Sequence, residues 1–229
     1  MLKLNNLNIY VLPVTPFQQN CSVVQCTKTF ETAIIDPGGE IDNILHFIKS
    51  TENMQIKYIL LTHGHLDHCG QAKVLSDKIN IPIYGPQKED IFWLNQLEQR
   101  QKSYTAAQYA FEPTKNFIPD FWLEEGQQLR LGNHIIDIIH TPGHTPGHIV
   151  FYIKELKIAW VGDVIFKQAV GRSDFPRGNI DDLMHSIIKK LLVLGDDYTF
   201  ICGHGEISTF GHERKYNPYI QPYLSMKDN

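Results

Sequence analysis

Four side chains of metal-binding types lie within the segment THGHLDH, residues 62–68: His63, His65, Asp67 and His68. Residues two apart in an extended chain point to the same side, so His63 and His65 can bind one ion together. If the chain then turns into a helix, Asp67 and His68 point toward a neighbouring position. A polar loop of solvated histidines is the ordinary alternative, but it does not account for this density of ligands. The segment therefore predicts a metal site.

Three later segments each add one candidate ligand. In TPGHTPGH, residues 141–148, proline and glycine predict a tight turn with His144 at its apex. Asp163 closes a Gly-Asp pair after an expected strand, and a carboxylate there can bridge two cations because it has two oxygens. His204 stands between two glycines in GHG, which lets the backbone approach closely. These motifs bring further nitrogen and carboxylate ligands from distant parts of the sequence.

Other candidate ligands beside these motifs have simpler interpretations. His140 and His148 border the turn that carries His144, and each fits a supporting or surface position better than a place on an ion. Cys202 precedes His204 in an expected strand, where alternation directs its side chain away from the ion and into the core. A thiolate ligand at Cys202 is the alternative.

The candidates suggest two neighbouring ions. One ion would take three histidines, the second an aspartate and two histidines, and Asp163 would bridge them. The first set is His63, His65 and His144, and the second is Asp67, His68 and His204. Such ligands suit zinc, which we expect, and also iron or manganese. Two divalent ions roughly 3.5–4 Å apart could hold a hydroxide between them and polarise a carbonyl, which points to catalysis.

The segments that must position these ligands alternate between strands and helices. Runs rich in Val, Ile and Tyr predict strands at 8–14, 21–26, 32–35, 58–61, 81–84, 128–131, 135–139, 149–153, 157–160 and 199–202. Apolar residues at helical spacing predict helices at 40–51, 69–79 and 180–194. Each ligand motif follows a strand, where a rigid scaffold presents functional side chains. The order strands-then-helix occurs twice and predicts two similar halves, packed sheet against sheet with helices outside.

The segment 86–118 and the C-terminal tail fit this pattern less clearly. Helical pieces are expected at 89–99 and 106–111, with scattered aromatic residues between them. Such an insertion either shapes a site or forms a plain helical cover. Two prolines mark 218–229 as a short tail. The length of the chain suits one domain over 1–229.

Composition narrows the class of protein. Hydrophobic residues make up 42% of the chain, which is enough to build a core, and the net charge of −4 argues against a nucleic-acid binder. We expect no membrane span, because no apolar run approaches about 18 residues. The first residues lack the apolar run of a secretory signal, and the four cysteines form no CxxC pair, so we expect a cytoplasmic protein. A small molecule is the expected partner, and the oligomeric state stays open.

At these motifs the chain resembles the metallo-β-lactamase-fold superfamily. THGHLDH, TPGHTPGH, the Gly-Asp pair at 162–163 and GHG at 203–205 occur in the family's order, and the Asp-Pro-Gly at 36–38 is similar to its early turn. The resemblance extends over residues 8–217. It implies an α/β fold, a four-layer αββα sandwich in which two mixed sheets pack together with helices outside.

Within the superfamily, the segments 171–179 and 203–218 resemble a short bacterial branch of the glyoxalase II group, the hydroxyacylglutathione hydrolases. This resemblance implies hydrolysis of a thioester such as S-lactoylglutathione by a metal-bridging hydroxide that Asp67 orients. It also implies that Arg172 contacts an anionic part of the substrate, with a salt bridge to Asp174 as the alternative role. The sequence GRSD is similar to the persulfide dioxygenases, which use a single iron. A non-catalytic metal-binding module is a third possibility.

Overall fold

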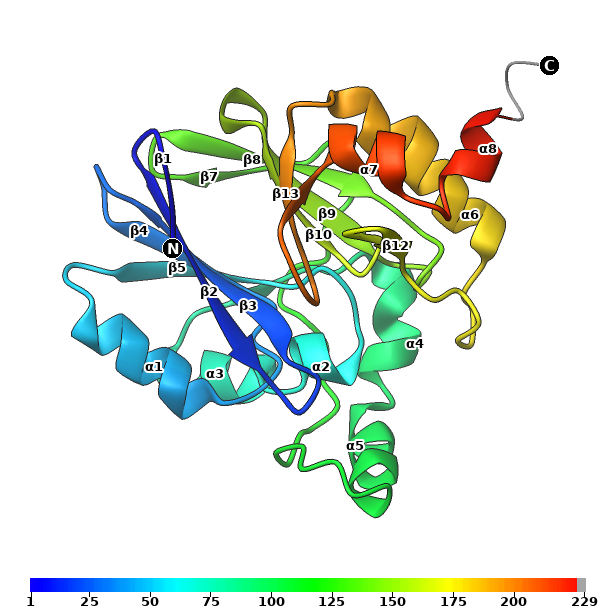
Figure 1. Cartoon of the computed structure of the whole chain (residues 1–229). Coiled ribbons are helices and arrows are strands. Elements are labelled where there is room, and N and C mark those ends of the chain that lie inside the picture. The colour runs from blue at the N-terminus through cyan, green and yellow to red at the C-terminus, as the bar shows by residue number, and fades with distance from the viewer. Residues whose placement is uncertain (226–229) are drawn as a thin grey trace.

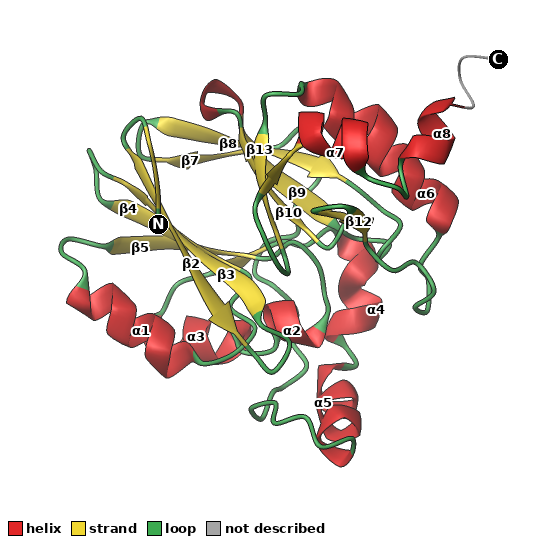
Figure 2. Cartoon of the chain, in the orientation of Figure 1, coloured by secondary structure: helices red, strands yellow, loops and turns green. Residues whose placement is uncertain are grey.

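The computed structural model describes residues 1–225. Two six-stranded sheets lie face to face, and helices cover both outer faces (Figures 1 and 2). The expected α/β class and the four-layer αββα sandwich are therefore confirmed. Within the described part of the chain, none of the helices combines the length and the apolar character needed to cross a membrane.

The first sheet has the order β1-β2-β3-β4-β5-β6. Its strands are Leu2–Leu4, Leu7–Val14, Gln19–Cys26, Glu31–Ile35, Gln55–Leu60 and Ile83–Tyr84. Strands β1 to β4 form an antiparallel meander, whereas β4, β5 and β6 run parallel. Parallel neighbours need a crossover, which α1 (Ile41–Ser50) supplies before β5, and α2 (Leu66–Cys69) and α3 (Ala72–Ile79) supply before β6.

The second sheet has the order β14-β13-β10-β9-β8-β7. In chain order, its strands are Gln128–Leu131, His134–His140, Ile149–Ile153, Ile158–Gly162, Thr199–Cys202 and Ser208–Thr209. Strands β7 to β10 form an antiparallel meander, and β13 pairs parallel with β10 after the crossover helix α6 (Ile180–His185). Each sheet thus begins as a meander and continues through a helical crossover, as the repeated order in the sequence predicted.

Three apolar clusters hold the layers together. One lies between the sheets and contains the fully buried Phe151. A second packs the first sheet against α1 and α3, and a third packs the second sheet against α6 and α7 (Phe210–Tyr216). Helix α6 continues without a break through residues 186–194, so the helix expected at 180–194 is confirmed. The cores fix the ends of the strands from which the ligand loops leave.

Four expected elements need correction. The helix expected at 89–99 is not continuous: α4 (Ile91–Leu94) ends before a turn at 95–96, and a new helix, α5, begins at Leu97. The helix expected at 69–79 is two helices, and α2 begins already at Leu66, so Asp67 and His68 lie inside its first turn. The helix expected at 106–111 is absent from the described structure, because α5 (Leu97–Ala106) ends early and Phe111 turns into the core. The tail contains a further short helix, α8 (Gln221–Ser225), while 226–229 lie outside the described residues.

The sequence did not indicate several short elements. These are β1, β14, α7 and the hairpin of β11 (Ile165–Phe166) with β12 (Ala169–Val170). The insertion forms α4 (Ile91–Leu94) and α5, which lie below the sheets in Figure 1. These helices and the β11–β12 hairpin both reach the cavity described below.

Candidate metal centre

All seven candidate ligands meet at one end of the two sheets. The loop after β5 carries His63 and His65, and α2 carries the next two candidates. His144 lies between β8 and β9, Asp163 follows β10, and His204 follows β13. The structure therefore brings together every residue that the motifs singled out, although these residues span 142 positions from 63 to 204.

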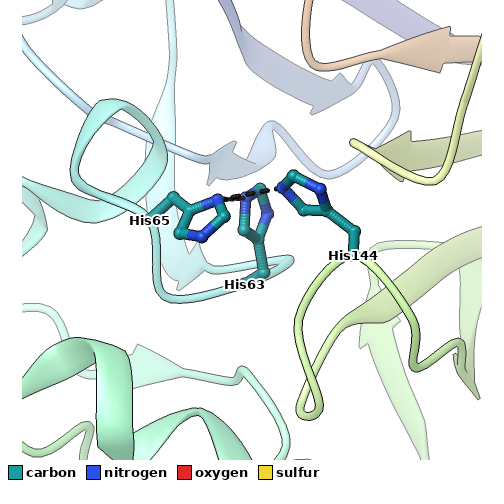
Figure 3. Close-up of side chains that lie close together, drawn as sticks. All are labelled: His63, His65 and His144. Atoms are coloured by element: carbon teal, nitrogen blue, oxygen red, sulfur yellow. Dashed lines mark hydrogen bonds between the residues drawn. The ribbon is translucent and has the colours of Figure 1, made fainter. Parts of the chain in front are cut away.

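The first ligand set is a triangle of imidazoles. His65 Nδ1 lies 3.1 Å from His63 Nε2 and 2.9 Å from His144 Nε2 (Figure 3). His144 Nδ1 lies 2.7 Å from the carbonyl oxygen of Arg172, which accepts its proton. This contact fixes the tautomer, so the Nε2 lone pair points into the triangle. Ring nitrogens that converge in this way suit one bound cation.

The second set combines carboxylate and imidazole. Asp67 Oδ2 lies 3.1 Å from His204 Nε2 and 3.8 Å from His68 Nε2. The Nδ1 atoms of both histidines donate elsewhere, from His68 to Asp36 at 2.9 Å and from His204 to the carbonyl of Phe17 at 3.0 Å. Because both Nδ1 protons are engaged elsewhere, the Nε2 atoms of the two rings face carboxylate oxygens, an arrangement that a cation between them would stabilise.

Asp163 lies between the two sets. Its Oδ1 is 3.2 Å from His68 Nε2, and its Oδ2 is 3.6 Å from both His144 Nε2 and His204 Nε2. His68 Nε2 and Asp163 Oδ1 are buried and make no hydrogen bond within the described residues. Buried polar atoms without partners are costly. These residues therefore fit bound metal ions, which would give such atoms a partner.

The electrostatics of the cluster also favour cations. Burial lowers the pKa of His63 well below its ordinary value, and the neighbouring histidines lower it further. Burial also lowers the pKa of His68, but Asp163 and Asp67 outweigh this effect and hold it well above the ordinary value. Burial raises the pKa of Asp163, but His68 and His204 outweigh it and hold it well below its ordinary value. The carboxylates thus stabilise positive charge, which a metal ion can supply.

Asp36 supports one histidine of each set. Its Oδ1 accepts the backbone N–H of Thr62 at 2.8 Å, and its Oδ2 accepts the Thr62 hydroxyl at 2.6 Å and His68 Nδ1 at 2.9 Å. The Thr62 oxygen in turn lies 3.1 Å from His63 Nδ1 and accepts its proton. A single carboxylate therefore orients both rings and fixes their tautomers.

Asp90 is a supporting residue that the sequence did not reveal. Its Oδ2 accepts Gly64 N–H and the Thr145 hydroxyl, both at 2.8 Å, and its Oδ1 accepts Gly147 N–H at 2.6 Å. It thus ties the loop of His63 to the turn of His144. Burial raises the pKa of Asp90 to about 6, against the opposing effect of its three donors.

The neighbouring residues serve as supports rather than ligands. His148 is fully buried, not at the surface, and its Nε2 accepts the backbone N–H of Asp163 at 3.1 Å. His140 Nε2 lies 2.8 Å from the carbonyl oxygen of Pro146 and holds the same turn. The Cys202 thiol points to the His204 carbonyl at 2.9 Å, and burial raises its pKa to about 12. Cys202 is buried and belongs to none of the described groups of converging ligands, in line with the expectation that it packs in the core.

A cavity of about 290 Å³ opens onto the centre. Its apolar walls come from three parts of the chain, and they include Phe17, Trp93, Tyr104 and Phe175. Trp93 and Tyr104 belong to the insertion, which thereby shapes the cavity rather than only covering the sheets. Arg172 also lines this cavity. The arrangement can hold a small molecule with its reactive group at the ligand cluster.

Gly203 leaves the room that two candidate ligands need. A Cβ atom at this position would lie 2.0 Å from Asp163 Oδ1 and 2.5 Å from His68 Cε1. Gly203→Ala is expected to displace both side chains and to weaken metal affinity by about 10- to 100-fold, measured by competition with a chromogenic chelator. Gly205→Ala is the comparison variant: a Cβ there meets nothing within 4 Å, but the φ of +80° strains an alanine, so it reports backbone strain in the same loop without a clash at the ligands. Unchanged affinity in Gly203→Ala would contradict this prediction.

Known proteins resemble the chain in sequence and in structure. The model of the metallo-beta-lactamase superfamily matches residues 14–204. The chain is 42% identical over 215 residues to hydroxyacylglutathione hydrolase GloC of Haemophilus influenzae, with 93% of this chain and 98% of that protein covered. The fold superposes on BLEG-1 B3 metallo-beta-lactamase with a TM-score of 0.82 at 31% identity, covering 93% of this chain and 99% of that one. It superposes on TTHA1623 in a di-iron-bound form with a TM-score of 0.79 at 31% identity, covering 92% and 99%.

These matches agree with the molecule itself. The matched range begins in β2 and ends at His204, so it contains every candidate ligand. The two-sheet sandwich, the order of the ligand motifs and the matches along nearly the whole chain have one explanation. The chain belongs to the metallo-beta-lactamase superfamily.

Proposed function

We propose that this metallo-hydrolase cleaves thioesters such as S-lactoylglutathione. The observation that carries the proposal is the meeting of two ligand sets at Asp163, beside a cavity with apolar walls. The similarity to a hydroxyacylglutathione hydrolase over 93% of the chain supports the same class of substrate. The cavity volume of about 290 Å³ suits a small molecule.

The proposed cofactor is a pair of divalent ions, most simply zinc. The residues proposed to hold the ions are His63, His65 and His144 for the first, Asp67, His68 and His204 for the second, and Asp163 for both. Bound there, the ions would supply Lewis acidity, which lowers the pKa of water and polarises a carbonyl. Iron is the alternative, because the similar TTHA1623 is described in a di-iron-bound form.

Asp67 is the proposed catalytic residue. Its side chain lines the cavity and is 14% exposed, so it is accessible to both water and substrate. A carboxylate there can accept a hydrogen bond from the attacking water and orient it toward the acyl carbon. The departing thiol has an ordinary pKa of about 8.5, so it leaves as a thiolate without a dedicated proton donor. This property of the leaving group favours thioesters over amides.

Metal removal tests the proposal directly. Purified protein is expected to release glutathione thiol from S-lactoylglutathione, to lose this activity after chelation, and to regain it when zinc is returned. Elemental analysis is expected to give two ions per chain in the active form. Hydrolysis that survives complete removal of metal would show that the ligand cluster is not the catalytic centre.

The competing function, oxidation of a persulfide by one iron, is separated by a second assay. Glutathione persulfide is supplied to the same preparation and oxygen uptake is followed with an electrode. Thioester hydrolysis without oxygen uptake supports the proposal. Oxygen uptake by protein with one iron per chain, and no thioester hydrolysis, would replace it, while inactivity in both assays would favour a non-catalytic metal-binding module.

We also propose that the protein acts in the cytoplasm. All four cysteines are free and buried, which suits a reducing compartment. Fractionation of the native cells with antibody detection is the corresponding measurement.

A further inference from the structure

Two arginines line the cavity, and they differ in whether a carboxylate of the protein pairs with the guanidinium. Arg172 follows the β11–β12 hairpin, and Arg100 lies on α5 of the insertion. A substrate anion in this cavity would be drawn to whichever guanidinium has free donors. The contacts of the two side chains identify that residue.

Arg172 already has a carboxylate partner. Its Nε lies 2.9 Å from Asp174 Oδ1 and its Nη2 lies 2.8 Å from Asp174 Oδ2, a bidentate pair. The side chain is also 66% exposed, so water competes for its remaining donors. The salt bridge that the sequence left as an alternative is therefore present, and the charge of Arg172 is largely cancelled locally.

Arg100 is in the opposite situation. Its guanidinium carbon lies 4.5 Å from the centre of the Trp93 ring, and it makes no ion pair with any described residue. A guanidinium over an aromatic face keeps its N–H donors available for a carboxylate, and the ring restricts its position. Trp93 in turn packs edge-on against His65, with ring centres 4.3 Å apart. One aromatic ring thus separates the guanidinium from a candidate ligand.

The wall beside Arg100 suits the uncharged part of a substrate. Trp93, Leu97 and Tyr104 line the cavity next to it, and the first two side chains are buried. Burial and the charge of Asp67 raise the pKa of Tyr104, while the charges of Arg100 and Arg172 oppose this effect. The Tyr104 hydroxyl therefore lies within electrostatic range of both arginines and of the candidate catalytic carboxylate. The cavity therefore joins the ligand cluster to a cationic end through an apolar middle.

We propose that Arg100 binds a carboxylate on the thiol portion of the substrate and so determines the preference for anionic thioesters. This inference rests on the proposed function and assigns a specificity residue to the same cavity. The acyl group would lie at the ligand cluster, the thiol portion along Trp93 and Tyr104, and its carboxylate against the guanidinium of Arg100. A thioester of an uncharged thiol would lack this last contact.

Ligand binding tests the inference without turnover. Metal-loaded protein is titrated calorimetrically with S-hexylglutathione, which cannot be hydrolysed, and with its diethyl ester, in which both carboxylates are masked. Wild type is expected to bind the acid about tenfold more tightly than the ester, as one charge-assisted hydrogen bond implies. Arg100→Met is expected to bind both with similar affinity. Lys102→Met, which removes an exposed cation from the same helix outside the cavity, is expected to keep the wild-type preference.

Two outcomes would overturn the inference: no preference for the acid in wild type, or an undiminished preference in Arg100→Met. A hydrolysis assay with a lactoyl thioester of N-acetylcysteamine, an uncharged thiol, separates this failure from failure of the proposed function. Arg100→Met is expected to hydrolyse that substrate as wild type does while losing about tenfold in kcat/KM for S-lactoylglutathione. If neither thioester is hydrolysed but the binding preference depends on Arg100, the proposed function fails and the anion site stands.

Discussion

Asp163→Ala is expected to reduce bound metal from two ions per chain to one or none and to lower thioester hydrolysis by at least about a hundredfold. The reason is geometric, because this one carboxylate reaches both ligand sets: Oδ1 lies 3.2 Å from His68 Nε2, and Oδ2 lies 3.6 Å from both His144 Nε2 and His204 Nε2. Without it, both ligand sets would lose an oxygen ligand and the negative charge that stabilises a cation between them. Elemental analysis and a thiol-release assay measure the two effects.

A second variant separates charge from shape in this experiment. Asp163→Asn keeps the size of the side chain but removes its negative charge, so metal content is expected to fall here too. Asp77→Asn is the control, since this exposed carboxylate pairs with Lys73 on the surface of α3 and with no other residue of 1–225. If the alanine variant retains two ions and full activity, the bridging role of Asp163 is wrong.

The backbone holds Asp163 in place independently of metal. Its N–H donates to His148 Nε2, and the preceding Gly162 has a φ of +48°, a conformation that suits glycine. A Cβ on Gly162 would lie 2.5 Å from the same His148 atom. The backbone position of Asp163 is therefore set by folding, so the effects of Asp163→Ala are expected to report on the lost carboxylate and not on a loop that has moved.

Most of the fold and the ligand cluster could be predicted, because they depend on patterns between residues that lie close together in the sequence. The strands carry continuous Val and Ile because both faces of each sheet are buried, and the ligands follow those strands at fixed offsets. His63 and His65 share one side of an extended segment, so their convergence is local geometry. By contrast, the end of α5 at Ala106 depends on Phe111 packing against Phe17, a contact that helical periodicity cannot reveal.

The supporting residues were harder to predict, because their roles depend on contacts between distant segments. Asp90 lies 26 residues from Gly64 and 57 from Gly147, within a segment whose sequence has no clear pattern. His148 resembles a surface residue in sequence, because its partner, the N–H of Asp163, is 15 positions away. A ligand motif can be identified in the sequence from its residue types. A residue that only supports the ligands can be identified from its hydrogen bonds in the folded structure.

Asp90→Asn is expected to lower the free energy of unfolding of the metal-free protein by about 2–3 kcal/mol, measured by urea denaturation. The carboxylate is fully buried and accepts three hydrogen bonds, one of them at 2.6 Å from Gly147 N–H to Oδ1. An amide in the same place has only one oxygen, so at least one of these donors would face an –NH2 group and lose its acceptor. The loop of His63 and the turn of His144 would then separate, because Asp90 is their common anchor.

The same substitution should therefore weaken metal binding although Asp90 is not among the candidate ligands. We expect affinity at the first set to fall by about 10- to 100-fold, as for other groups that orient metal ligands, with competition against a chelator as the measurement. Asp120→Asn is the matched control: this exposed carboxylate also accepts a backbone N–H, that of Ile83 at 2.8 Å, but lies outside the ligand loops. Loss of stability with unchanged metal affinity in Asp90→Asn would show that Asp90 supports the fold alone. Loss of both in Asp90→Asn, and of neither in Asp120→Asn, would establish that it aligns the two loops.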